Sequence, residues 1–370
     1  MSIQIFKVGG CVRDRLLREE GFDVPEGDVD WVVTGATPEE MLARGFMPVG
    51  SDFPVFLHPK THEEYALART ERKTARGYHG FSFYASPDVS LEQDLLRRDL
   101  TINAMAEDAE GRIIDPWGGR RDLKMRTLRH VSDAFAEDPV RILRLARFAA
   151  RFPSFVVAPE TLALCRQMVG NGEADALVAE RIWQELRRGL SESNPGRMIE
   201  VLKDCGAWER LFGDIPLSNA VCEALSRAAS RRLAVEIRAA VLFSGFGDAL
   251  RLRARLQALR VESDTIGVCE LTSRLHRRVS RFESADDYVD LLEAADVLRR
   301  PVRFDLFLSA CAVLHPEADL TDLRRAARAF VQTDAGKAAR AAGGRNIAQV
   351  VRQARLKAVR TELDNLSSEC

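Results

Sequence analysis

Short apolar runs alternate with helical segments over the first third of the chain, and helical spacing alone fills the remainder. Runs of four to eight apolar or β-branched residues bounded by Gly and Pro indicate strands, whereas apolar residues three and four apart indicate helices. The pattern therefore predicts an α+β fold. We expect a head with a small mixed β-sheet and helices over residues 1–125, followed by an all-α neck over residues 126–210 and an all-α body and tail over residues 211–370.

The segment IFKVGGCVRDRLLREEGFDVPEGDVDWVV, residues 5–33, contains the strongest chemical pattern. It predicts a strand ending in Gly9 and Gly10, then a helix that carries Arg13, then a strand that carries Asp28 and Asp30. Side chains two apart on a strand point to the same face, about 6 to 7 Å apart, so the two carboxylates can share a divalent metal ion. Glycines before a helix N-terminus let a triphosphate approach the backbone amides, and a nearby arginine can add charge-assisted bonds.

The rest of the predicted head contains four further segments of interest. TPEEMLARGF (residues 37–46) predicts a helix capped by Thr37, and residues 49–70 predict a hairpin turning near Pro59 and Lys60. On its second strand, Glu64 is either a third active-site carboxylate or a solvated strand residue. Residues 70–90 mix Gly, Lys, Arg, Ser and Pro with aromatics and predict a mobile loop or a plain connector, and residues 91–106 show helical spacing.

Composition narrows the class of protein. The 370 residues carry a formal net charge of −1, which does not indicate a nucleic-acid binder, although residues 211–370 hold 25 Lys and Arg against 21 Asp and Glu. The seven cysteines lack C-x-x-C spacing, so neither a zinc site nor a disulfide framework is expected. No signal-peptide pattern and no run of about 18 apolar residues occurs, which predicts a soluble cytoplasmic protein with no membrane partner.

The motif GG-x-V-R-D followed by D-x-D resembles the bacterial class II tRNA nucleotidyltransferases, the CCA-adding enzymes of the polymerase β nucleotidyltransferase superfamily. This resemblance implies transfer of CMP and AMP from CTP and ATP to the 3′ end of tRNA, with release of pyrophosphate. It implies Mg²⁺ held by Asp28 and Asp30, which act as catalytic residues with Glu64. RRDLTINAM resembles the second family motif, in which Arg98 contacts the nucleotide phosphates and Asp99 the ribose hydroxyls.

EDPVR, residues 137–141, resembles the family's nucleobase-reading motif and opens a predicted helix over residues 137–152. A carboxylate accepts from the exocyclic amino group shared by cytosine and adenine, and an arginine donates to the adjacent ring nitrogen. Asp138 and Arg141 would thus select C and A against U and G, although Asp138 can equally be only a helix cap. By the resemblance, Arg144 and Arg147 bind phosphate or the primer end.

Other interpretations stay open. A poly(A) polymerase, a CC-only or A-only adding relative, and a non-catalytic RNA-binding module share parts of this pattern. His276 and His315 are the only histidines past residue 200 and no His-Asp pair occurs, so no HD phosphohydrolase activity is expected. Basic segments 249–260 and 347–360 are candidate tRNA contacts, but the sequence specifies neither the tRNA-binding helices, nor the oligomeric state, nor whether one chain adds both CC and A.

Overall fold

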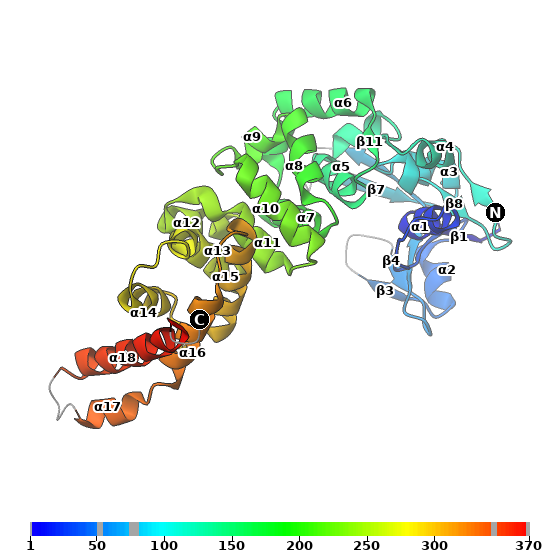
Figure 1. The fold of residues 1–370 in the computed structure, drawn as a ribbon. Coiled ribbons are helices and arrows are strands. Elements are labelled where there is room, and N and C mark those ends of the chain that lie inside the picture. Colours follow the sequence, from blue (N-terminus) through cyan, green and yellow to red (C-terminus); the bar gives the residue numbers. More distant parts are fainter. Residues whose placement is uncertain (1, 50–54, 74–80, 342–345, 368–370) are drawn as a thin grey trace. The chain divides into compact units, whose positions relative to one another are not determined.

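The protein divides into two compact units (Figure 1). The structure is a computed structural model that describes residues 2–49, 55–73, 81–341 and 346–367. Unit 1 comprises residues 1–189 and 197–213, and unit 2 comprises residues 190–196 and 214–370. Within the described residues every strand belongs to unit 1, and unit 2 is helical. The predicted α+β fold is confirmed.

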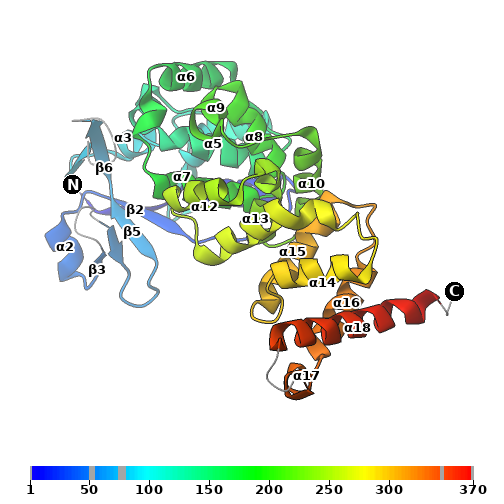
Figure 2. The same ribbon diagram turned by 90° about the vertical axis from the view of Figure 1, so that its left-hand side faces the viewer.

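A seven-stranded mixed sheet forms the centre of the first part of unit 1, with strand order β3-β4-β5-β2-β1-β8-β9. Its only parallel pair among the described strands is β2–β5, and the other neighbours run antiparallel. Figure 2 shows β2 and β5 side by side. The bounds are β1 Gln4–Val8, β2 Asp30–Thr34, β3 Met47–Val49, β4 Val55–Leu57, β5 Glu64–Leu67, β8 Ala106–Glu107 and β9 Ile113–Ile114.

Alternation along β2 divides the core between the two faces of the sheet. Val32 packs in a cluster with α3 (Leu91–Leu96), whereas Val33 packs with Met41 of α2 (Pro38–Ala43). Asp30 shares the face of Val32 because side chains two apart point the same way. The strand therefore presents its acidic residue on the face covered by α3.

The predicted strand–helix–strand unit is present, but its second strand is shorter than expected. β1 is followed by α1 (Gly10–Glu19), and β2 begins only at Asp30. Asp28 lies in exposed coil before β2, so the prediction that one strand carries both carboxylates is wrong. The α2 helix begins as predicted, with a capping box between Thr37 and Glu40, and β4 and β5 form the predicted hairpin.

Three segments differ from their sequence predictions. Within the predicted loop, β6 (Arg69–Lys73) and β7 (Phe81–Ala85) pair as a two-stranded sheet, while residues 74–80 lie outside the described residues. The helix expected over residues 91–106 ends at Leu96 and resumes as a 3₁₀ turn, Thr101–Asn103, because Leu100 pairs with His130 instead. The stretch expected to be wholly helical contains β10 (Thr127–Leu128) and β11 (Val156–Val157).

The remaining described α-helices belong to the later part of unit 1 and to unit 2. In unit 1 and at its boundary these are α4 Gly119–Lys124, α5 Val140–Arg151, α6 Pro159–Gly170, α7 Ala179–Ser191, α8 Pro195–Asp204 and α9 Ala207–Phe212. Unit 2 contains α10 Asn219–Ser230, α11 Val235–Leu242, α12 Ala249–Ala258, α13 Ser263–Leu275, α14 Ala285–Ala294, α15 Pro301–Leu314, α16 Thr321–Gln332, α17 Ala335–Ala341 and α18 Ile347–Ser367.

Part of the core of unit 2 forms where α14, α15, α16 and α18 meet, around the fully buried Val289, Phe307 and Phe330. Both figures show α16 and α18 side by side within this unit. In the part of the chain that the structure describes, no helix has the length and apolar character needed to cross a membrane.

Gly119 allows α4 to pack directly on the 3₁₀ turn that holds Asn103. A Cβ at Gly119 would collide with the Thr101 carbonyl oxygen and with the Met105 side chain. Neither the backbone carbonyl nor the fully buried Met105 has room to move. The close approach therefore requires glycine at this position.

We expect Gly119→Ala to destabilise unit 1 by about 2 kcal/mol, because overpacking a filled site forces the backbone to shift. Gly170→Ala is the matched control, since a Cβ there meets no atom within 4 Å and alanine favours the helix. All four tryptophans, Trp31, Trp117, Trp183 and Trp208, lie in unit 1, so tryptophan fluorescence in urea follows that unit alone. Equal stability of the two variants would contradict the assignment.

Candidate active site

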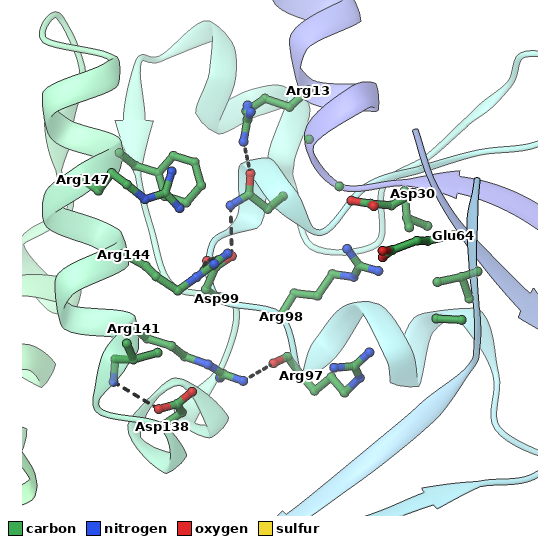
Figure 3. A pocket seen from close by; sticks show the side chains of 18 of the residues that line it. Arg13, Asp30, Glu64, Arg97, Arg98, Asp99, Asp138, Arg141, Arg144 and Arg147 are labelled. Atoms are coloured by element: carbon green, nitrogen blue, oxygen red, sulfur yellow. Dashed lines mark hydrogen bonds and ion pairs between the residues drawn. The ribbon is translucent and has the colours of Figure 1, made fainter. Parts of the chain in front are cut away.

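A pocket of about 550 Å³ lies inside unit 1 and gathers residues from seven segments of the chain (Figure 3). One wall comes from the β1–α1 junction and from the first residues of β2 and β5. The opposite wall comes from α5 and α7, and the segment after α3 lies between them. The pocket thus contains most of the residues that the sequence analysis selected: Gly10, Arg13, Asp30, Glu64, Arg98, Asp99, Asp138, Arg141, Arg144 and Arg147.

The β1–α1 junction exposes backbone rather than side chains to this pocket. Gly9 has φ 74° and ψ −123°, and a Cβ there would stand 2.9 Å from Nη1 of Arg98. Gly10 is the first residue of α1, so the free amide groups of the helix N-terminus lie at the same place. The positive φ favours glycine at position 9, and the absence of a Cβ leaves room for the end of the Arg98 side chain.

The acidic residues meet through the parallel pairing of β2 with β5. Asp30 and Glu64 are register partners, and both line the pocket. The pKa of Asp30 is raised chiefly because its carboxylate is withdrawn from water, although the residue as a whole is exposed. Arg98 opposes this shift, while Glu64 and Asp28 add to it. Asp28 is therefore electrostatically coupled to Asp30 although it lies outside the strand.

This donor set fits a hard cation such as Mg²⁺, which prefers carboxylate oxygens and is commonly held by one or two carboxylates together with substrate phosphates. The repulsion of Asp30 by Glu64 and by Asp28 would be relieved by positive charge at this place. Among the described residues no group of three or more His, Cys, Asp or Glu forms a ready metal cage. Substrate oxygens would have to complete the coordination.

Asp99 is almost fully buried and connects the middle of the pocket to α5. Its Oδ2 accepts from Nε of Arg144 at 2.8 Å and from Nη2 at 2.7 Å. Its Oδ1 accepts from Nδ2 of Asn103 and from the Leu100 amide. Burial opposes ionisation, but these contacts, led by Arg144, hold the pKa of Asp99 well below its usual value. Asp99 is therefore ionised at neutral pH.

The same chain of bonds continues from Asn103 to α1. Asn103 Oδ1 accepts from Nη1 of Arg13, whose Nε donates to Asp14 at 2.8 Å, and Asp14 in turn accepts from Arg151. Arg13 also lies over the ring of Phe148, 5.2 Å from its centroid. Burial lowers the pKa of Arg13, and Asp14 opposes that shift. Asn103, Asp14 and the ring of Phe148 together fix the guanidinium of Arg13 in place.

Asp138 and Arg141 both line the pocket, but each is engaged elsewhere. Asp138 forms a two-point ion pair with Arg181 of α7, at 2.7 and 3.1 Å, and accepts from the Val140 amide at the start of α5. Arg141 donates to the carbonyl oxygens of Ala134 and Arg97, each at 2.7 Å. Asp138 is thus a helix-end acceptor and an ion-pair partner at once.

Arg147 bonds Glu185 at 2.7 Å and lies over Phe148.

Sequence reasoning missed several groups that hold the site together. Asn103 bridges Arg13 and Asp99, and Asp94 pairs with Arg97 and Arg98. Asn103 lies inside the RRDLTINAM motif, four residues after Asp99, and its place in that motif was the one available signal. Asp94 carried no such signal, because an acid on a short helix is usually solvated.

Two family models match the chain. Residues 5–129 match the poly A polymerase head domain, and residues 154–217 match a probable RNA- and SrmB-binding site of polymerase A. The chain is 49% identical over 360 residues to the CCA-adding enzyme of Bordetella bronchiseptica, an alignment that covers 97% of this chain and 96% of that protein. The chain belongs to the CCA-adding enzyme family.

Further relatives support this assignment. The multifunctional CCA protein of Leptothrix cholodnii is 52% identical over 341 residues, which cover 82% of this chain and 80% of that protein. The crystal structure of the Bacillus stearothermophilus CCA-adding enzyme with CTP is 26% identical, with a TM-score of 0.65 over 91% of this chain and 81% of that one. The resemblance drawn from the sequence motifs is confirmed, and the chain is a nucleotidyltransferase of a generally metal-dependent family.

We expect Asp99→Asn to lower the stability of unit 1 by about 2 kcal/mol at pH 7, because the variant loses a charge-assisted bond and leaves Arg144 without its partner. The folded-state pKa of Asp99 is depressed, so its contribution is complete above the unfolded value of about 3.9 and is lost as pH falls below it. The stability difference between wild type and variant should therefore shrink from pH 5 to pH 3.

The measurement is urea unfolding followed by tryptophan fluorescence at several pH values. Asp175→Asn is the control, because Asp175 pairs with Arg210 on the surface, where solvent screening leaves an ion pair little effect on stability. A difference for Asp99→Asn that is the same at pH 3 and pH 7 would refute the role given to its charge.

Proposed function

We propose that this enzyme completes or repairs the 3′-terminal CCA of tRNA by transferring CMP and AMP from CTP and ATP without a nucleic-acid template, releasing pyrophosphate. The observation that carries the proposal is one pocket with paired acids at one end and arginines from the RRD and EDPVR motifs along the other side. Family membership supports the same reaction class.

The phosphate end of the pocket is proposed at Gly9 and Gly10. A triphosphate there would meet backbone amides at the start of α1, where the helix dipole favours anions. Arg98 is in contact range of Gly9 and adds a positive charge, and Arg13 adds a second from within α1. These groups would bind and orient the leaving pyrophosphate.

The reacting end is proposed at Asp28, Asp30 and Glu64. Asp28 and Asp30 would hold Mg²⁺, which when bound stabilises the charge that develops on the transferred phosphoryl group and on the attacking and leaving oxygens. Glu64 stands beside Asp30 in register and would orient the primer 3′-hydroxyl. The raised pKa of Asp30 supports this assignment, because it marks a carboxylate that is withdrawn from water and that also has Glu64 and Asp28 nearby.

The base end is proposed at Asp138 and Arg141, with Asp99 near the ribose and with Arg144 and Arg147 toward the phosphate or the primer. For Asp138 to accept from a nucleobase amino group, it would share or release its ion pair with Arg181. Arg141 would likewise redirect a donor now bonded to a backbone carbonyl. Reading the base would therefore require Asp138 and Arg141 to exchange their present protein partners for groups on the nucleobase edge.

Further proposals concern the rest of the chain. We assign residues 1–125 to the catalytic head, 126–210 to the neck that reads the base, and 211–370 to a body and tail that bind tRNA. In unit 2, Arg253 pairs with Glu270, Arg255 with Asp214, and Arg352 with acids of α14, so RNA phosphates would have to compete with these ion pairs. The six described cysteines are free thiols, in keeping with the reducing cytoplasm.

The deciding experiment is incubation with tRNA that lacks its last three nucleotides, using each labelled NTP alone and CTP with ATP. We expect two additions with CTP alone and three with CTP and ATP. Long adenylate tails from ATP alone would identify a poly(A) polymerase instead, and arrest after two additions with both nucleotides would identify a CC-adding enzyme. A folded protein that incorporates nothing would exclude the proposal.

Asp30→Ala should abolish transfer while unit 1 remains folded. The ionised carboxylate of Asp30 is disfavoured by burial and, to a smaller extent, by Glu64 and Asp28, so its removal should leave stability at neutral pH unchanged or slightly higher. Labelled-CTP incorporation in Mg²⁺ and thermal unfolding measure the two effects. Asp23→Ala, in the exposed coil before β2, is the control and should keep full activity.

A substitution at Asp138 tests the base-reading assignment. Asp138→Arg should lose the preference for CTP and ATP and gain relative use of UTP or GTP. The expected shift in the kcat/KM ratios is about tenfold or more, because one correctly read base edge contributes about 1 to 3 kcal/mol.

The structure supplies the control for this test. Arg181→Met removes the ion-pair partner of Asp138 but keeps its carboxylate, so it should lower stability or overall rate and leave nucleotide ratios unchanged. If the Asp138 variant behaves like the Arg181 variant, with all four nucleotides affected alike, the residue only supports the helix.

A further inference from the structure

Asp94 is a carboxylate with no exposed surface, on the short helix α3. The helix buries Leu91 and Leu95 against the sheet, and Asp94 is buried with them. A buried carboxylate is costly unless it is paired and hydrogen-bonded. The hydrogen-bond partners of Asp94 therefore indicate which groups this carboxylate holds in place.

Its two oxygens have different partners. Oδ1 accepts from Nη2 of Arg97 at 2.7 Å and from the Arg69 amide at 3.3 Å. Oδ2 accepts from Nη2 of Arg98 at 3.3 Å. Although burial opposes ionisation, Arg97 and Arg98 keep the pKa of Asp94 below its usual value. One charge thus holds two consecutive arginines that leave the end of α3.

The Oδ1 side anchors the backbone at the start of β6. Asp94 accepts from the Arg69 N–H, and Nε of Arg97 donates to the Arg69 carbonyl oxygen at 3.1 Å. The backbone N–H and C=O of Arg69 are thus both bonded by side chains from the C-terminal end of α3. The carboxylate is therefore fixed in place before it contacts Arg98.

The Oδ2 side faces the pocket. Arg98 stands between Asp94, the backbone of Gly9 and the carboxylate of Asp30, to which it is electrostatically coupled (Figure 3 shows Arg98 reaching toward Asp30 and Glu64). A long flexible side chain so close to two acids would be drawn onto them without a competing anchor. The buried carboxylate of Asp94 competes with Asp30 and Glu64 for Arg98, and it does so from a fixed position.

We propose that Asp94 is a positioning residue for the nucleotide, which holds Arg98 at the Gly9 turn and prevents it from closing onto Asp30 and Glu64. The inference rests on the proposed contact between Arg98 and the nucleotide phosphates. Asp94 itself is buried behind Arg98 and contacts no substrate. Its effect on the reaction is exerted entirely through the placement of Arg98.

A double-mutant cycle tests this. Kd for CTP and for ATP, measured by calorimetry, is compared for wild type, Asp94→Asn, Arg98→Gln and the double variant. We expect Asp94→Asn to raise both Kd values about tenfold, because a misplaced arginine loses a charge-assisted phosphate contact. The preference for CTP and ATP over UTP and GTP should not change. The double variant should bind no more weakly than Arg98→Gln alone.

Glu92→Gln is the matched control, since it removes an exposed acid from the same helix and should leave Kd unchanged. A second variant, Asp94→Glu, keeps the charge and should fold even if Asp94→Asn does not. Its longer side chain displaces Arg98 and should raise Kd about threefold or more. Asp94→Glu with wild-type Kd would overturn the proposal, as would a folded Asp94→Asn protein with wild-type Kd.

Two further outcomes separate this inference from the proposed function. If Arg98→Gln weakens binding but its effect and that of Asp94→Asn simply add, Asp94 does not act through Arg98 and the inference fails alone. If Arg98→Gln leaves Kd unchanged, the phosphate contact assigned to Arg98 fails first, and the inference with it.

Discussion

The pocket depends on keeping many positive charges apart in a small space. Nine arginines of the described chain line it, and arginine cannot shed its charge in a protein. Each must therefore be held by a carboxylate, a carbonyl oxygen or an aromatic face. Asp99 holds Arg144, Glu185 holds Arg147, and the rings of Phe148 and Phe152 cover Arg13. The arrangement is pre-organised for an anion, because the positive charges are fixed in place before any ligand arrives.

The carboxylates in and around the pocket fall into two groups, those that anchor arginines and those at the end proposed to bind metal. Asp94 and Asp99 anchor arginines, are buried and have depressed pKa values. The acid at the open end, Asp30, has a raised pKa and only Arg98 lowering it among the causes of its shift. One pocket therefore contains carboxylates committed to structure and a carboxylate left under-compensated, which is the condition for binding a cation together with a polyphosphate.

Much of the fold could be predicted because its signals are local. The Gly9–Gly10 turn, the α2 capping box and the change to helices after the head follow from spacing and cap residues over a few positions. The β2 strand was predicted too long because its alternation continues back to Asp28, whereas β5 pairs with it only from Asp30 onward. The β6–β7 pair was missed because residues 70–90 mix Gly, Lys, Arg, Ser and Pro with aromatics, a composition that matches a loop as well as a hairpin.

The hydrogen-bond and ion-pair partners of the pocket residues were harder to predict than which residues line the pocket. The resemblance to family motifs identified Arg98, Asp99, Asp138 and Arg141 as site residues. Nothing local indicates that Asp138 meets Arg181 or that Asn103 links Arg13 to Asp99. These bonds join residues that are from 4 to 90 positions apart. They are set by how the layers of unit 1 pack, which periodicity does not encode.

The span of sequence in this one pocket has a consequence for biosynthesis. Its first residues precede α1 and its last, Arg181, lies in α7, so a growing chain has no complete pocket until about half of it has left the ribosome. The parallel β2–β5 pairing requires a long connection to close before it is stabilised, and such non-local contacts form slowly. A nascent chain interrupted before α7 would leave Asp138 without Arg181 and Arg147 without Glu185. Such a fragment would carry a net negative charge and an incomplete arginine wall, so it would not be a partly active enzyme.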